Sequence, residues 1–77
     1  MKKYILIEVA NREINHAVYD SINQASLNLY ALFMNVCSKH DLNLDDDYEC
    51  WISEDCDMAY ANGKNCWYDW QIIEVEA

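Results

Sequence analysis

The sequence predicts an α+β fold in which one amphipathic helix packs on a three- to four-stranded antiparallel sheet, in the order β-(β)-α-β-β. Three features indicate this fold: an apolar β-branched segment near the N-terminus, one long segment with helical periodicity, and an alternating segment close to the C-terminus. With 77 residues, no proline and one glycine, the chain contains no linker or internal repeat. We therefore expect a single domain over residues 1–77.

The first strand is expected at residues 3–10, which are rich in β-branched and aromatic side chains and are followed by polar residues. This composition predicts a strand that is buried on at least one face. Residues 13–19 show a weaker alternation, in which Ile14, His16 and Val18 share one parity. This segment is either a short second strand or a connector, with His16 at the surface.

The helix is expected to begin at Ser21, because Ser21 and Gln24 have the spacing of a capping box. The pattern ends near His40 or Asp41, where a histidine side chain is favourable beside the negative end of the helix dipole. Between residues 27 and 34 the helix is apolar on more than one side, which indicates a dimer contact or packing under a loop. The apolar stripe expected to face the sheet consists of Ile22, Ala25, Leu29, Phe33, Val36, Cys37 and His40.

The C-terminal half is expected to add two strands, at residues 48–53 and 65–76. We interpret residues 54–64 between them as a polar excursion that ends in a turn at Asn62-Gly63, since both residue types accept a positive φ angle. Side chains alternate along a strand, so one parity of the last strand faces the helix and the other faces away. The two sets are Trp67, Asp69 and Gln71 on one face, and Tyr68, Trp70 and Ile72 on the other.

Acidic residues dominate the charge, with fourteen Asp and Glu against five Lys and Arg and a formal net charge of −9. Residues 41–77 contain eleven of these acids and only Lys64 as a base. Such a chain is repelled by nucleic acid and by anionic membranes, which both require Lys and Arg for binding. The asymmetry indicates an interaction surface for a basic protein, although acids also serve to keep a small apolar domain soluble.

A cytoplasmic location is expected. The apolar run after Met1 is interrupted by Glu8 and leads to no small-residue cleavage site, and no apolar segment approaches the ~20 residues of a membrane helix. In that compartment cysteines are normally reduced. We therefore expect free, buried thiols at Cys37, Cys50, Cys56 and Cys66.

Metal and cofactor sites are not predicted. The cysteines lack the paired Cys-x2-Cys spacing of structural zinc sites, and only Cys37 and His40 are close enough in sequence to share a metal. The acidic run at residues 45–49 fails as an EF-hand, because Cys50 stands where the loop requires glycine. We expect no cofactor.

An enzyme is not predicted either. No serine or cysteine has a base placed by a recognisable signature, and His16 and His40 lie in separate elements. The only glycine is Gly63, so no glycine-rich loop can hold a phosphate group. The sequence therefore favours a binding protein.

The candidate partner-binding residues combine acids and aromatic side chains of the C-terminal half. Exposed aromatic residues act as anchors in protein interfaces and acids steer a basic partner, whereas the alternative is that all three tryptophans belong to the core. The candidates are Asp45, Asp46, Asp47, Glu49, Glu54, Asp55, Asp57, Asp69, Trp51, Trp67 and Tyr68.

In size and acidity the chain resembles the small inhibitors that phages encode against host defences, namely anti-CRISPR proteins and DNA-mimic inhibitors of restriction enzymes. Residues 59–73 are also similar to the ends of small phage proteins. The resemblance implies an inhibitor whose carboxylates replace phosphates in the nucleic-acid site of a CRISPR effector, a nuclease or another basic enzyme. The alternative is a homo-oligomeric accessory module, such as a homodimer, without inhibitory activity.

Overall fold

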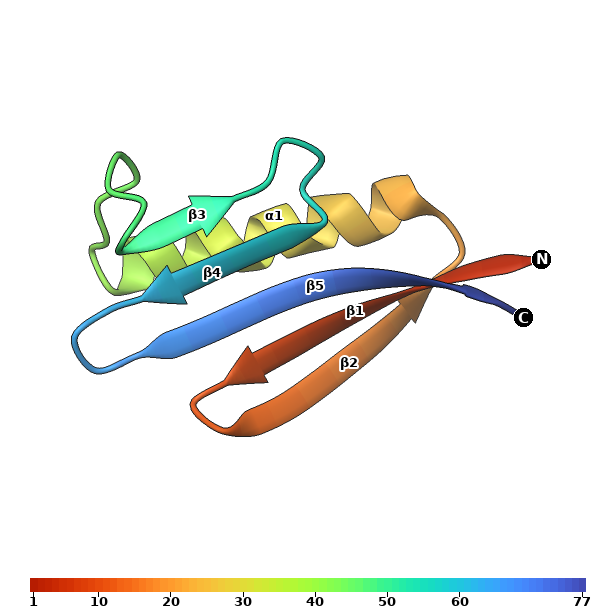
Figure 1. The fold of residues 1–77 in the computed structure, drawn as a ribbon, viewed down its shortest axis with the longest axis horizontal. Coiled ribbons are helices and arrows are strands. Elements are labelled where there is room, and N and C mark those ends of the chain that lie inside the picture. The colour runs from red at the N-terminus through yellow and green to blue at the C-terminus, as the bar shows by residue number, and fades with distance from the viewer.

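The computed structural model describes all residues 1–77 and has two layers, a five-stranded antiparallel sheet and one helix that lies across a single face of it (Figure 1). The strand order in the sheet is β2-β1-β5-β4-β3. The elements are β1 (Lys2–Ala10), β2 (Glu13–Tyr19), α1 (Ile22–Lys39), β3 (Cys50–Ile52), β4 (Met58–Asn62) and β5 (Trp67–Glu76).

The sheet is built around the pairing of its first and last strands. β1 and β5 are antiparallel neighbours from Lys2 opposite Glu76 to Ala10 opposite Tyr68. The two chain ends meet there, since the Ala77 N–H donates to the Met1 carbonyl oxygen at 2.8 Å. The hairpin partners β2 and β4 flank this pair, and β3 forms the outer edge beyond β4.

The expected α+β class is confirmed, but the expectation of three or four strands is wrong. Residues 13–19 form a strand, and β4 lies inside the segment interpreted as a polar excursion, so the order is β-β-α-β-β-β. The pattern of β4 is weak because two of its five residues are alanines, which are depleted in strands. Ala59 and Ala61 are almost completely buried, and their small side chains leave room for α1 to pack closely on this strand.

Two tight turns depend on specific backbone conformations. Asn11 and Arg12 both have positive φ, 49° and 79°, the pattern of a two-residue type I′ hairpin between β1 and β2. The turn at Asn62-Gly63 is present, although Gly63 does not adopt a positive φ. Glycine is required there for close approach, because a Cβ atom at residue 63 would lie 2.6 Å from the Cys66 Sγ atom.

The boundaries of α1 agree with the expected caps. The Ser21 hydroxyl oxygen accepts a hydrogen bond from the Gln24 N–H at 3.1 Å. At the other end the Leu42 N–H donates to the Cys37 carbonyl oxygen at 2.9 Å and Asp41 has a φ of 54°, which together form a Schellman motif. The helix therefore ends on an aspartate in the left-handed conformation, where glycine or asparagine is usual.

His40, the last residue of the expected apolar stripe, faces the sheet at this helix end. Its ring packs beside Tyr68, with 6.2 Å between ring centroids, and its Nε2 atom is buried without a hydrogen-bond partner.

The core lies between α1 and one face of the sheet, with Trp70 at its centre. Trp70 is 2% exposed, packs edge-to-face on Phe33 with centroids 6.0 Å apart, and donates its Nε1–H to the Glu8 carboxylate at 2.7 Å. Ile22 was expected in the stripe but is exposed. The other core residues are Leu6, Leu29, Val36, Cys37, Cys50, Ala59 and Ala61.

Replacing Asp41 with glycine should stabilise the protein. Glycine removes both the cost of the left-handed conformation and a carboxylate beside the negative end of the helix dipole. We expect the free energy of unfolding, measured by urea denaturation, to rise by about 0.5–1 kcal/mol. Asp41→Asn is the matched control, because it removes the charge and keeps a side chain that tolerates this conformation. An unchanged or lower urea midpoint for Asp41→Gly would contradict this description of the helix end.

Candidate functional site

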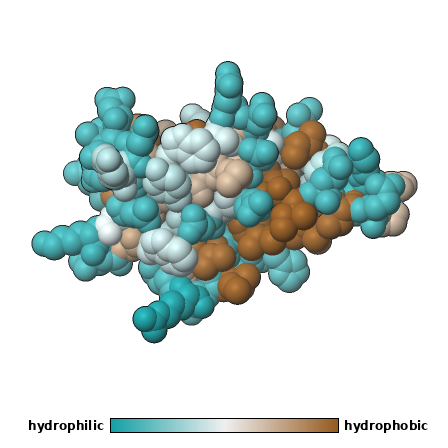
Figure 2. All heavy atoms as spheres, viewed as in Figure 1, coloured by the Kyte–Doolittle hydropathy of each residue, from teal (hydrophilic) through white to brown (hydrophobic).

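The face of the sheet opposite α1 is not covered by any element of the chain (Figures 1 and 2). We call this surface the open face. Every second side chain of each strand lies on this face. Cross-strand neighbours form rows on it, such as Val18, Ile5 and Ile73. Hydrophobic side chains extend across it in Figure 2. Its apolar members are Ile5, Ile7, Val9, Ile14, Val18, Trp51, Met58, Tyr60, Trp67, Ile73 and Val75, and its polar members include His16, Asp69 and Gln71.

The exposure of this face is large for a small domain. Ile14 and Val18 are 72% and 57% exposed, and Met58, Trp67 and Trp51 lie between 38% and 46%. Exposed apolar side chains are normal when they occur singly, but a contiguous patch marks an interaction site. The open face is therefore a candidate binding surface.

An aromatic pair stands at the β3 side of the open face. Trp51 and Tyr60 are cross-strand neighbours whose rings stack at 5.9 Å with an angle of 25°. The Tyr60 hydroxyl donates to the Asp47 carbonyl oxygen and so ties β4 to the loop that precedes β3. This contact fixes the orientation of the aromatic pair.

Beside the aromatic pair the open face is hollowed into a cavity of about 180 Å³, which we call the Asp69 cup. Asp69 is its only charged residue, and burial among apolar groups raises the pKa of its carboxyl group above the ordinary value of 3.8. The other lining residues are Ile7, Val9, Trp51, Met58, Ala59, Tyr60, Trp70 and Gln71.

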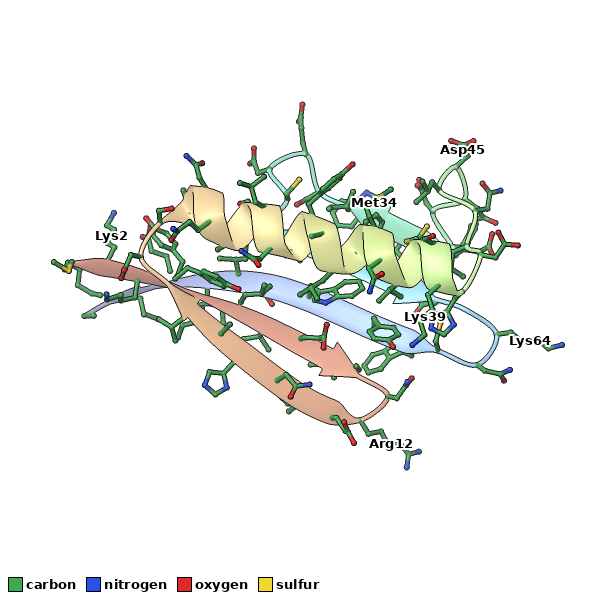
Figure 3. All side chains as sticks on the ribbon, turned by 180° about the vertical axis from the view of Figure 1, so that it is seen from behind. Lys2, Arg12, Met34, Lys39, Asp45 and Lys64 are labelled. Atoms are coloured by element: carbon green, nitrogen blue, oxygen red, sulfur yellow. The ribbon has the colours of Figure 1, made fainter.

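Seven acids gather in the two loops that flank β3, and we call this region the acidic edge. β3 is only three residues long, so the loops before and after it are separated by roughly 10 Å of strand. No lysine or arginine occurs between Lys39 and Lys64. Figure 3 shows Asp45 on the opposite side of the molecule from Arg12. The acidic edge comprises Asp45, Asp46, Asp47, Glu49, Glu54, Asp55 and Asp57.

None of these seven carboxylates forms an ion pair within the chain. The only ion pairs are Met1 with Glu76, Lys2 with Glu74, and Lys3 with Asp20, all of them outside the acidic edge. The negative charge of the acidic edge is therefore not neutralised from within.

Two of the seven acids shape their own loops. An oxygen of Asp46 accepts from the Tyr48 N–H at 2.9 Å, and an oxygen of Asp57 accepts from the Ser53 hydroxyl at 2.7 Å. These local hydrogen bonds are typical of acids in turns. The carboxylates left for a partner are those of Asp45, Asp47, Glu49, Glu54 and Asp55.

The structure separates the predicted aromatic residues. Trp51 and Trp67 lie on the open face, as does Asp69, whereas Tyr68 faces the helix and stacks on Trp70 at 5.5 Å. The alternation predicted for the last strand is confirmed. Grouping Tyr68 with the other two aromatic residues was inconsistent with that alternation, because Tyr68 belongs to the opposite parity.

Sequence reasoning missed the apolar part of the open face. The signal was available in residues 3–10, where Ile5, Ile7 and Val9 are apolar at one parity while Leu6 occupies the other. A strand that is apolar at both parities is normally buried on both faces. Here only one face is covered by the chain itself.

The thiols of Cys37, Cys50 and Cys66 are free and buried, as expected, whereas the free thiol of Cys56 is only half-buried. Burial and a hydrogen bond with Cys50 raise the pKa of Cys37 to about 12, so this thiol stays protonated at neutral pH. No three His, Cys, Asp or Glu side chains are grouped so that they could hold a metal ion. The one helix does not combine the length and the apolar character that crossing a membrane requires.

Comparisons with protein-family models, with curated proteins and with solved structures gave no match to this chain.

Replacing Asp69 with asparagine should stabilise the fold at neutral pH. Below the ordinary pKa of 3.8 the carboxyl group is neutral in both states, so the two proteins should unfold alike. As the pH rises the unfolded chain ionises first, and the native protein loses stability relative to the variant. Thermal unfolding should therefore show a higher midpoint for Asp69→Asn at pH 7 and a smaller difference at pH 3. Asp45→Asn is the exposed control, and equal midpoints for all three proteins at pH 7 would contradict a desolvated Asp69.

Proposed function

We propose that this protein is a small acidic binding protein that inhibits a basic, nucleic-acid-handling protein by occupying its nucleic-acid site. The observation that supports this proposal best is the acidic edge, whose carboxylates lack internal ion pairs and lie next to the pair formed by the exposed Trp51 and the half-buried Tyr60. A CRISPR effector or a nuclease of a host defence system is the class of partner that the resemblance to phage inhibitors favours.

Charge supplies the first part of the mechanism. A nucleic-acid channel is lined by Lys and Arg that normally neutralise phosphates. The loops on either side of β3 present Asp45, Asp47 and Glu49 on one side and Glu54 and Asp55 on the other. These carboxylates can take the place of phosphates, and their long-range field accelerates the approach of a basic partner.

Apolar contact supplies the second part. Ion pairs at an exposed surface contribute little to net affinity, since both partners are well solvated before they meet. Trp51, Trp67 and Met58 expose apolar area next to the acids, and aromatic anchors of this kind dominate the affinity of protein interfaces. Inhibition by occlusion thus combines acidic steering with an apolar anchor.

The test compares two triple variants that remove the same charge from different places. The edge variant is Asp45→Asn with Asp47→Asn and Glu49→Gln, which spares the structural Asp46. The control is Glu13→Gln with Glu74→Gln and Glu76→Gln, which lie outside the acidic edge. After capture from bacterial lysate identifies the basic enzyme, its DNA binding is measured against each inhibitor at several salt concentrations.

We expect the edge variant to inhibit at least about tenfold more weakly and with a flatter salt dependence, because close charge pairs across an interface each contribute substantially. The control should inhibit almost as well as the native protein. Equal losses for both variants would mean that only net charge matters. No loss for the edge variant would contradict nucleic-acid mimicry.

Self-association is the second candidate function, and one observation favours it. Leu27 and Tyr30 are 69% and 47% exposed on the outer side of α1, on the segment where the sequence indicated a dimer contact. Sedimentation equilibrium of the native protein and of Leu27→Glu decides the matter. A dimer that the substitution converts to a monomer would support a homo-oligomeric accessory module, whereas a monomer at all concentrations would exclude it.

A further inference from the structure

The Asp69 cup contains a carboxylate that the fold itself does not need. Asp69 lies on β5 in the interior of the sheet, with Val9 of β1 and Tyr60 of β4 as its cross-strand neighbours. Trp67 and Gln71 precede and follow it on the same face. An alternating strand pattern would place an apolar residue at this position, because most of its neighbours are apolar.

No cation within the chain compensates this carboxylate. The three ion pairs of the protein involve other acids, and desolvation is the only cause that raises the pKa of Asp69. The register places two bases on the open face: His16 on β2, two strands away from β5, and Lys3 on β1, which pairs with Asp20. A partly desolvated charge without a partner costs stability, and groups retained at such a cost mark functional sites.

The walls of the cup are suited to a flat cation. The Trp51–Tyr60 pair borders the cavity, and the faces of aromatic rings carry the negative part of their quadrupole. Gln71 offers an amide oxygen as a second acceptor, and Ile7, Val9 and Met58 supply apolar surface for an aliphatic stem. A guanidinium group is planar, weakly hydrated and able to stack, whereas an ammonium group remains strongly hydrated.

We propose that the Asp69 cup binds the guanidinium group of one arginine that projects from the protein partner. The proposal rests on the function proposed above and adds to it a defined anchoring contact. The acidic edge would act at long range, and the cup would accept a single side chain that pairs with Asp69 and stacks beside Trp51. An arginine that normally contacts a phosphate of the nucleic acid has this chemistry.

The test uses isotope-labelled full-length protein and three small probes: N-acetyl-arginine methylamide, the lysine analogue and the norleucine analogue. We expect the arginine probe to shift the NMR signals of the Trp51 indole N–H, the Gln71 side-chain amide and the Asp69 backbone amide. A single exposed contact of this type gives a Kd of roughly 1–50 mM. The lysine probe should bind several-fold more weakly, and norleucine should produce no localised shifts.

Asp69→Asn should raise the Kd of the arginine probe at least about tenfold, since the substitution removes the charge with little change in the shape of the side chain. Glu13→Gln, which removes a carboxylate at the start of β2, is the matched control and should bind like the native protein. Equal shifts with arginine and norleucine, or no loss in Asp69→Asn, would overturn the assignment of the cup to a cation.

The same variants separate the two proposals. If Asp69→Asn inhibits the captured enzyme as well as the native protein while the edge variant does not, the cup proposal is wrong and the proposed function stands. If the native protein inhibits no basic enzyme, the proposed function fails, and the probe titration still decides whether the cup binds guanidinium. If the cup signals shift with protein concentration alone and Arg12→Lys abolishes the shift, the occupant is Arg12 of a second copy, which overturns the assignment to a different protein.

Discussion

The structure depends on the packing of one helix against one face of a five-stranded sheet. Trp70 occupies the centre of this contact, where it meets Phe33 from the helix and Glu8 from the neighbouring strand. Ala59 and Ala61 allow the helix to lie close to β4. Because the chain has only one helix, no element covers the second face of the sheet. The apolar side chains of that face are therefore left at the surface.

Local signals in the sequence predicted most of the elements. The capping serine, the apolar stripe of α1 and the alternation along β5 are properties of neighbouring residues, and each was recovered except for Ile22 at the start of the stripe. β4 was missed because its alanines are favourable only when a helix packs on them, which is a tertiary effect. Gly63 was assigned to the correct turn for the wrong reason, since its role depends on Cys66 and Leu42, which approach it only in the folded chain.

The candidate site shows the same division. Charge is visible in the composition, so the acids of the two loops could be named without a structure. The sequence did not predict that Asp46 and Asp57 form hydrogen bonds within their loops, or that the Tyr68 side chain faces the helix. The isolation of Asp69 depends on neighbours from three other strands. The acids around β3 also have a protective effect: a short edge strand flanked by like charges is a poor template for pairing with other chains.

The position of β1 and β5 at the middle of the sheet has a consequence for synthesis in the cell. β1 is made before β5, so the hydrogen bonds between these two strands cannot form until β5 has left the ribosome. Contacts between such distant segments also slow folding, because a long loop must close before they form. The nascent chain therefore lacks this strand pair until β5 emerges, and the apolar residues of β1 are available to chaperones during that interval.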